Sequence, residues 1–156
     1  MARTGRLTAS SRLAAAADRV WAEATAAAGI NYELMPIVRM TVPRGLDTLS
    51  VGDVHDGQHV GRSWLLLGGV LPFDYDDITI ERVGPGLAFQ EDSTMLSQRS
   101  WRHHRVVEPI GDRACTVTDT VEFVPRLPVP VRALELVFGQ TFAHRHRRLR
   151  RRYGTA

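Results

Sequence analysis

The stretch WRHHRVVEPIGDRACTVTDTVEFV, residues 101–124, determines the fold more than any other part of the chain. Its two halves alternate in side-chain direction as β-strands do, and the residues between them, which include Gly111, are typical of a turn. In the second half every inward-facing residue is apolar except Asp119, while His103 and Arg105 lie on the matching face of the first half. The stretch therefore predicts a β-hairpin that directs one acidic and two basic side chains toward an apolar interior.

The register of this hairpin stays open at the level of sequence. If the hairpin is symmetric about Gly111, His103 lies opposite Asp119. A shift of two residues brings Arg105 or Trp101 opposite Asp119 instead, without changing the face on which any of them lies. The first two registers bring both basic side chains within reach of the carboxylate.

Strand and helix signals continue outward from the hairpin. An alternating stretch at 6–13 predicts a first strand. Asp18 is a predicted N-cap for a helix that Gly29 ends, and Asn31 is predicted to cap a second short helix that ends at Pro36. Further strands are predicted at residues 37–42, 60–67, 73–83 and 87–95.

The chain closes with a long helix, predicted over residues 131–152, that has an apolar stripe including Phe142. An antiparallel sheet must cover its apolar face, and this helix is the segment available for that purpose. We therefore expect one α+β domain over residues 1–156, with a curved antiparallel sheet of about seven strands, two short helices after the first strand and a long C-terminal helix.

Composition limits the class of protein. With 44% hydrophobic and 24% charged residues, the chain is globular rather than disordered. Its single cysteine, Cys115, can form no internal disulfide, so we expect a protein of the reducing cytoplasm. The alanines at 14–17 are followed at once by Asp18 and Arg19, which predicts no secretory signal. The longest apolar stretch, residues 63–73, is too short for a transmembrane segment.

Four short segments carry a resemblance to a known superfamily: ADRVW at 17–21, WRHHR at 101–105, TDTVEF at 118–123 and FAHRHRRL at 142–149. With the order of predicted elements, they make the chain resemble the START-like, or SRPBCC, superfamily, which includes polyketide cyclase/dehydrase-like and lipid-transfer proteins. The resemblance implies a helix-grip fold, in which the sheet wraps around the terminal helix. It also implies a cavity between the two that binds a small apolar or amphipathic molecule.

Candidate ligand-binding residues follow from the hairpin and from neighbouring apolar positions. They are Trp101, His103, Arg105 and Asp119, together with Glu91, which shares a strand face with Phe89 and Met95, and Phe142 on the terminal helix. The charged group of the hairpin has three possible roles: an internal ion pair, a ligand contact, or proton transfer in catalysis. Glu91 is alternatively an exposed strand residue, and Trp21, Trp64 and Trp101 are most simply core residues. No catalytic residue is assigned.

Three functions remain open. The first is binding of a small apolar or amphipathic ligand, whose polar end the hairpin charges orient. The second, which rests on the resemblance, is a polyketide aromatase/cyclase-like enzyme that acts on a carrier-bound substrate. The third is an interaction protein with a closed core. We expect no cofactor and no metal, because His55 and His59 lie in a glycine-rich loop with nothing to align them.

All 20 basic residues are arginine, and six of them lie from Arg145 to Arg152. Cations at a helix C-terminus offset its dipole and keep it soluble. The alternative is a docking surface for an acidic carrier protein or another anionic surface. Nucleic acid is disfavoured, because Tyr153 is the one aromatic residue nearby that could stack on a base.

Overall fold

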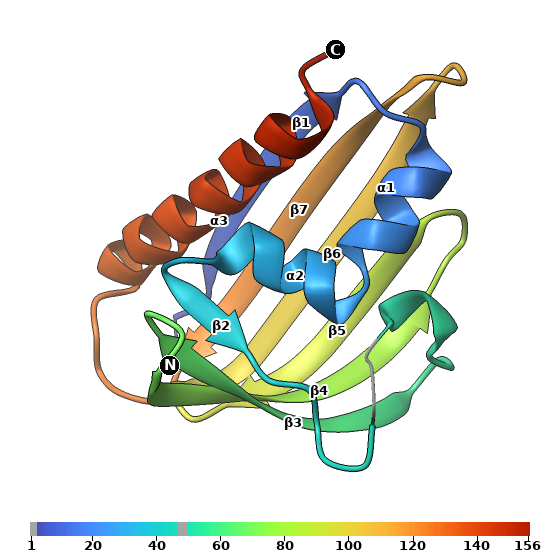
Figure 1. Cartoon of the computed structure of the whole chain (residues 1–156). Coiled ribbons are helices and arrows are strands. Elements are labelled where there is room, and N and C mark those ends of the chain that lie inside the picture. The colour runs from blue at the N-terminus through green and yellow to red at the C-terminus, as the bar shows by residue number, and fades with distance from the viewer. Residues whose placement is uncertain (1–2, 47–49) are drawn as a thin grey trace.

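Within residues 3–46 and 50–156, which the computed structural model describes, seven antiparallel strands form one curved sheet, and a long C-terminal helix lies across it (Figure 1). In chain order the elements are β1 (Gly5–Leu13), α1 (Ala17–Ala24), α2 (Ala27–Leu34), β2 (Val38–Met40), the short 3-10 helix η1 (Val51–Asp53), β3 (Gln58–Leu67), β4 (Leu71–Val83), β5 (Ala88–Met95), β6 (Gln98–Ile110), β7 (Ala114–Pro125) and α3 (Val131–Tyr153). The predicted α+β architecture and helix-grip arrangement are confirmed.

The strand order is β1-β7-β6-β5-β4-β3-β2, so consecutive strands from β2 to β7 are neighbours and β1 joins beside β7. All three helices lie over the same, concave face of the sheet (Figure 1). Helix α3 packs along β1 and against α2, while α1 packs on β6 and β7. The helices and the curved sheet therefore enclose a common interior.

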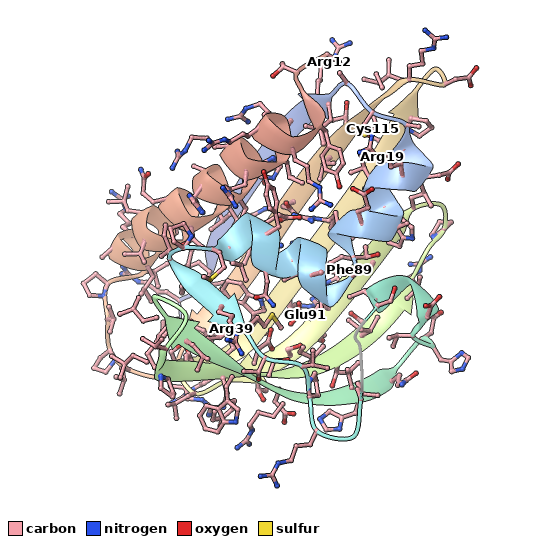
Figure 2. All side chains as sticks on the ribbon, in the orientation of Figure 1. Arg12, Arg19, Arg39, Phe89, Glu91 and Cys115 are labelled. Carbon is pink, nitrogen blue, oxygen red and sulfur yellow. The ribbon has the colours of Figure 1, made fainter. Side chains whose placement is uncertain are left out.

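The alternation expected in the hairpin is present. In β7 the inward residues, among them Cys115, Val117 and Phe123, have no exposed surface, whereas the residues between them are partly exposed. Figure 2 shows Phe89 and Glu91 on the helix-covered side of β5, and both are buried. The concave face thus supplies the core and a few polar side chains with it.

The predicted helix ends are partly wrong. Helix α1 begins at Ala17, after Ala16, and Asp18 lies in its first turn, where a carboxylate still stabilises the helix dipole. The helix ends at Ala24, and the hydroxyl of the next residue, Thr25, donates a hydrogen bond to the Trp21 carbonyl over 2.6 Å. A side chain that competes for the backbone in this way ends the helix before the predicted stop.

Gly29 and Asn31 both lie inside α2 rather than at helix ends. A Cβ atom at Gly29 would collide with the backbone carbonyl of Glu23, so this glycine permits the close approach of α1 and α2. The Asn31 side chain exchanges two hydrogen bonds with the backbone of Met40, at 2.7 and 2.9 Å. Asn31 therefore ties α2 to β2 instead of capping a helix.

Trp64 is not a core residue, contrary to expectation. Its exposed fraction is 43%, and it packs edge-on against Tyr75 at a centroid distance of 5.6 Å. Ser63, the preceding residue of β3, occupies the inward position and is fully buried. Because side chains alternate along a strand, the inward Ser63 forces Trp64 to the outer face.

Candidate functional site

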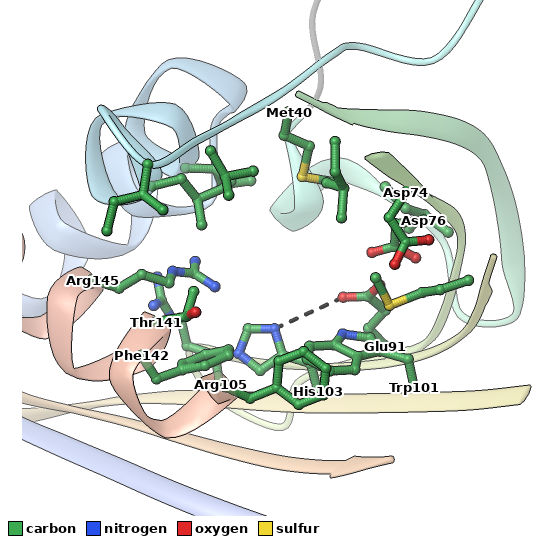
Figure 3. A pocket seen from close by; sticks show the side chains of 18 of the residues that line it. Met40, Asp74, Asp76, Glu91, Trp101, His103, Arg105, Thr141, Phe142 and Arg145 are labelled. Carbon is green, nitrogen blue, oxygen red and sulfur yellow. Dashed lines mark ion pairs between the residues drawn. The ribbon is translucent and has the colours of Figure 1, made fainter. Parts of the chain in front are cut away.

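A cavity of about 310 Å³ lies between the sheet and helices α2 and α3 (Figure 3). Its walls are mainly apolar, with side chains such as Ile78, Met95 and Phe142. Ligand cavities in proteins combine such apolar walls with a few placed polar groups. Here the polar groups on the wall are Asp74, Asp76, Glu91, His103, Arg105, Thr141 and Arg145.

The cavity opens to solvent through an apolar rim. Ile37, Leu67, Phe73 and Val137 all line the cavity, and each is about half exposed. They come from the α2–β2 connection, the ends of β3 and β4, and α3. A molecule that enters between these residues passes apolar surface before it meets a charge.

The hairpin has the second of the three possible registers. Arg105 lies opposite Asp119, and His103 lies opposite Val121. The two strands join through a turn at Gly111, which has φ 61° and leaves Ile110 paired with Ala114. The turn therefore extends past Gly111, and this accounts for the shift of two residues.

Asp119 is the centre of a cluster of buried charges, the Asp119 cluster, in which both of its carboxylate oxygens accept hydrogen bonds. Its Oδ1 accepts hydrogen bonds from His103 Nε2 and Arg105 Nε, both at 2.7 Å. Its Oδ2 accepts from Arg105 Nη2 and His146 Nε2, both at 2.8 Å. Burial alone would raise the pKa of Asp119, but the Arg105 charge and these hydrogen bonds hold that pKa well below its usual range.

A second buried carboxylate, Glu33 of α2, completes the charge balance around Arg105. It accepts from Arg105 Nη1 and Nη2, at 2.7 and 2.8 Å, and from Arg145 Nε at 2.9 Å. Burial would raise the pKa of Glu33, yet the two guanidinium groups lower it. Sequence reasoning missed Glu33, because nothing in its short helix marks it. The one available signal was charge: the inward-facing Arg105 and His103 had only Asp119 as an acidic partner, so a second buried acid was to be expected.

Helix α3 contributes His146 and Arg145 to this cluster, and both are buried. His146 donates from Nε2 to Asp119, and its Nδ1 lies 2.8 Å from the Ser11 hydroxyl. Arg150 Nη1 donates to the same hydroxyl over 2.7 Å. The cluster therefore extends from the cavity wall through α3 to the edge of β1.

The arginines at the end of α3 are mostly engaged within the molecule. Arg148 donates to the Tyr32 carbonyl over 2.9 Å and its guanidinium stands 4.1 Å from the Tyr32 ring centre. Arg152 pairs with Glu23 at 3.3 Å. With the buried Arg145 and with Arg150, four of the six arginines from 145 to 152 have internal partners. A docking surface for an acidic carrier protein gains no support from this arrangement.

His103 connects the Asp119 cluster to a second group of acids. Its Nε2 bonds Asp119, and its other ring nitrogen, Nδ1, lies 3.8 Å from Glu91 Oε2 (Figure 3). Phe89 and Phe142 pack edge-on against the imidazole, each with a centroid distance of 5.3 Å. Aromatic contacts on both sides and a carboxylate at Nε2 fix the ring in one orientation.

Asp76 and Glu91 form this second group, which we call the acid pair. Both line the cavity and both are buried, with exposed fractions of 6% and 8%. Neither Asp76 Oδ1 nor Glu91 Oε1 receives a hydrogen bond from a donor. Burial, followed by the nearby charge of Glu91, raises the pKa of Asp76 well above its usual range.

The structure thus brings Trp101, His103, Arg105, Glu91 and Phe142 together on the cavity wall. Sequence analysis placed the first three on one face of a strand and took Glu91 and Phe142 from other elements. Asp119 has no exposed surface and lies behind His103 and Arg105, outside the set that lines the cavity. A direct contact of these residues with a ligand remains a prediction.

Of the two histidines expected in the glycine-rich loop, His59 lies instead in β3 and has a partner there. His59 Nε2 lies 2.8 Å from Asp77 Oδ1 on the outer side of the sheet. In residues 3–46 and 50–156, no group of three or more His, Cys, Asp or Glu side chains is arranged to hold a metal ion. In that same part of the chain, no helix is both long enough and apolar enough to cross a membrane.

The curved sheet, the long helix across it and the cavity between them define a START/SRPBCC-like fold. A START superfamily protein from Mycobacterium smegmatis superposes with a TM-score of 0.66 at 13% identity, covering 95% of this chain and 96% of that one. The Zhui aromatase/cyclase from Streptomyces sp. R1128 does so with 0.62 at 13% identity, covering 94% and 92%. Norcoclaurine synthase from Thalictrum flavum, in complex with dopamine and hydroxybenzaldehyde, gives 0.56 at 14% identity, covering 93% and 85%.

These identities establish a shared fold alone. At the level of sequence, residues 11–153 match the family described as a domain of unknown function, DUF8410, and the chain belongs to that family. No curated protein matches the chain.

Proposed function

We propose that this protein binds a small apolar or amphipathic molecule in the cavity between the sheet and α3. The observation that carries the proposal is a cavity of about 310 Å³ with mainly apolar walls and an apolar rim. Burial of apolar surface would supply most of the affinity, at roughly 25 cal/mol per Å² before the costs of association. A protein with a closed core would have no such space.

The polar end of the ligand would lie at His103, between Arg105 and Glu91. Trp101 and Phe142 would contact its apolar part, since both line the same wall. Asp119 would act as a positioning residue, because its carboxylate holds His103 and Arg105 from behind. A ligand would then contact side chains whose directions are already fixed, so less side-chain entropy would be lost on binding.

An aromatase/cyclase-like enzyme is the second candidate. It is favoured by the position of the titratable His103 and Glu91 on the cavity wall, and by the fold shared with the Zhui aromatase/cyclase. General acid–base catalysis needs such groups within reach of a substrate. The carrier that such an enzyme would require has less support, because most arginines of the helix end already have partners.

We further infer a cytoplasmic location from the single cysteine. Cys115 is buried and unpaired among core residues, and burial raises the pKa of its thiol. Such a thiol suits a reducing compartment.

The test is native mass spectrometry of protein purified under mild conditions, followed by titration with octanol as a defined apolar probe. We expect a co-purified small molecule, and octanol binding after its removal. Thr141→Trp should abolish both, because Thr141 lines the cavity and the larger side chain would fill it. Gln140→Trp is the matched control, since Gln140 is exposed on the same helix. A wild-type protein that carries no molecule and binds no octanol would contradict the proposal.

A further inference from the structure

We propose that the acid pair, Asp76 and Glu91, is a subsite for a protonated amine, so that the molecule in the cavity is an apolar amine. This inference rests on the proposed function and adds the chemical class of the polar end. It assigns to the acid pair a role distinct from that of the Asp119 cluster.

The first step is the state of the two carboxyl groups. Asp76 projects from β4 and Glu91 from β5, and both face the cavity (Figure 3). One oxygen of each carboxyl group is buried without a donor. An unsatisfied buried acceptor costs about 1–3 kcal/mol, and more when the group is charged. These two oxygens therefore lack the donors that a ligand could bring.

The neighbouring acids do not share this deficiency. Asp74, also on the cavity wall, accepts from the Tyr75 and Ser97 backbone N–H groups at 2.8 and 3.3 Å, and from the Ser97 hydroxyl. On the opposite side of the cavity, Arg105 and Arg145 are paired with buried carboxylates. The acid pair is therefore where the polar wall is incomplete.

The second step is charge. Among the described residues that line the cavity, the base paired with Glu91 is His103, and at 3.8 Å this contact is longer than a hydrogen bond. Burial would raise the pKa of Glu91, but His103 lowers it, so Glu91 is the carboxyl group of the pair that ionises more readily. Asp76 faces Glu91 and Ser93 from β5, Ser63 from β3 and Asp74 on its own strand, so two of these four polar neighbours are acids. Without a ligand, the pair can relieve this repulsion when Asp76 retains a proton, as the raised pKa of Asp76 indicates.

A primary ammonium group would replace that proton. It carries one positive charge and three donors, so it can bond both carboxyl groups at once. A hydroxyl group has one donor and no charge, and would satisfy the pair less well. Charge-assisted hydrogen bonds are about twice as strong as neutral ones, which makes the amine the favoured ligand.

The experiment is isothermal titration calorimetry with three probes of equal chain length: octylamine, octanol and octanoate. For the wild-type protein we expect octylamine to bind roughly ten- to hundredfold more tightly than octanol, from one or two charge-assisted hydrogen bonds. Octanoate should bind least well, because the acid pair repels it.

Two isosteric variants test the residues separately. Asp76→Asn and Glu91→Gln should each weaken octylamine binding about tenfold or more relative to octanol binding measured on the same variant. Asp77→Asn is the matched control, because Asp77 follows Asp76 on β4 but pairs with His59 outside. If one variant failed to fold, the other would still decide the question.

The pH dependence supplies an independent readout. An ammonium group binds the ionised form of Asp76, so octylamine affinity should fall as pH drops through the raised pKa of Asp76. Asp76→Asn should remove this dependence. Octanol affinity should change little over the same range.

The outcomes separate the two proposals. If octanol binds but octylamine has no advantage, or if octanoate binds best, the amine subsite is wrong and the ligand cavity stands. If none of the three probes binds, both proposals fail. If octylamine gains its advantage from surface charge alone, Asp77→Asn will weaken it as much as Asp76→Asn does, and this result would also overturn the subsite.

Discussion

Two groups of buried charges, one in the cavity wall and one that extends behind it, differ in how many of their hydrogen-bond partners are present. In the Asp119 cluster, both carboxylate oxygens of Asp119 receive hydrogen bonds, and Glu33 is bonded to two guanidinium groups. In the acid pair, Asp76 and Glu91 each retain a buried oxygen without a donor. Both groups lie on the helix-covered side of the sheet, and both are almost fully removed from solvent.

The difference indicates separate roles. A buried charge network whose partners are all present holds elements together, here α2, α3 and the β6–β7 hairpin. A buried group that lacks partners costs stability, and such groups in native proteins often mark sites where a ligand supplies what is missing. We therefore assign a structural role to the Asp119 cluster, whose hydrogen bonds are all made, and a ligand-binding role to the acid pair, whose hydrogen bonds are not.

The largest effect on stability should follow from breaking the Asp119 cluster. Arg105→Met would leave the carboxylates of Asp119 and Glu33 without their main cation, and we expect a loss of about 3–5 kcal/mol in the free energy of unfolding. Urea denaturation measures this loss. Arg102→Met is the matched control, because Arg102 lies on the same strand in exposed ion pairs and should lose less than about 1 kcal/mol. Equal losses in the two variants would contradict a supporting role for the cluster.

A smaller effect of opposite sign should follow from Asp76→Asn. The raised pKa of Asp76 means that its contribution to stability is present at low pH and is lost as pH rises through that pKa. An asparagine does not ionise, so the variant should be more stable than the wild type above this pH and should match it below. Thermal denaturation across pH measures the difference. A variant that is less stable at every pH would show that the Asp76 carboxylate is needed for folding.

The smallest effect on stability tests how far the Asp119 cluster extends. Ser11→Ala removes the hydroxyl between His146 and Arg150, and we expect a loss of about 1 kcal/mol. Ser10→Ala serves as the control, since Ser10 is exposed on the outer side of β1 and bonds Thr118 there. If both serine variants had the same stability by urea denaturation, the cluster would end at His146.

Local sequence pattern was sufficient for the fold and for one half of the site. Period-two alternation placed His103, Arg105 and Asp119 on the inward face, because side-chain direction in a strand depends only on parity. The register required the turn geometry at Gly111, which the sequence left open. The hairpin was therefore predicted with its correct face and with three possible pairings.

The rest of the site depends on contacts between distant segments. Glu33, Arg145 and His146 lie on helices, where their burial depends on how α2 and α3 dock against the sheet and not on any neighbouring residue. The arginine-rich end of α3 has the composition of a solvated surface, yet Arg145 is almost fully buried. Charge composition alone could not distinguish an arginine that faces a buried glutamate from one that faces water.

The most direct test of the central claim uses the methionine methyl groups as reporters in nuclear magnetic resonance. Met40 and Met95 line the cavity, whereas Met35 lies outside the set that lines it. On titration of isotope-labelled protein with octanol, we expect the Met40 and Met95 signals to shift together and to saturate, while the Met35 signal stays in place. If the Met40 and Met95 signals did not move, or if all three moved alike, the proposal that the cavity receives the ligand would be contradicted.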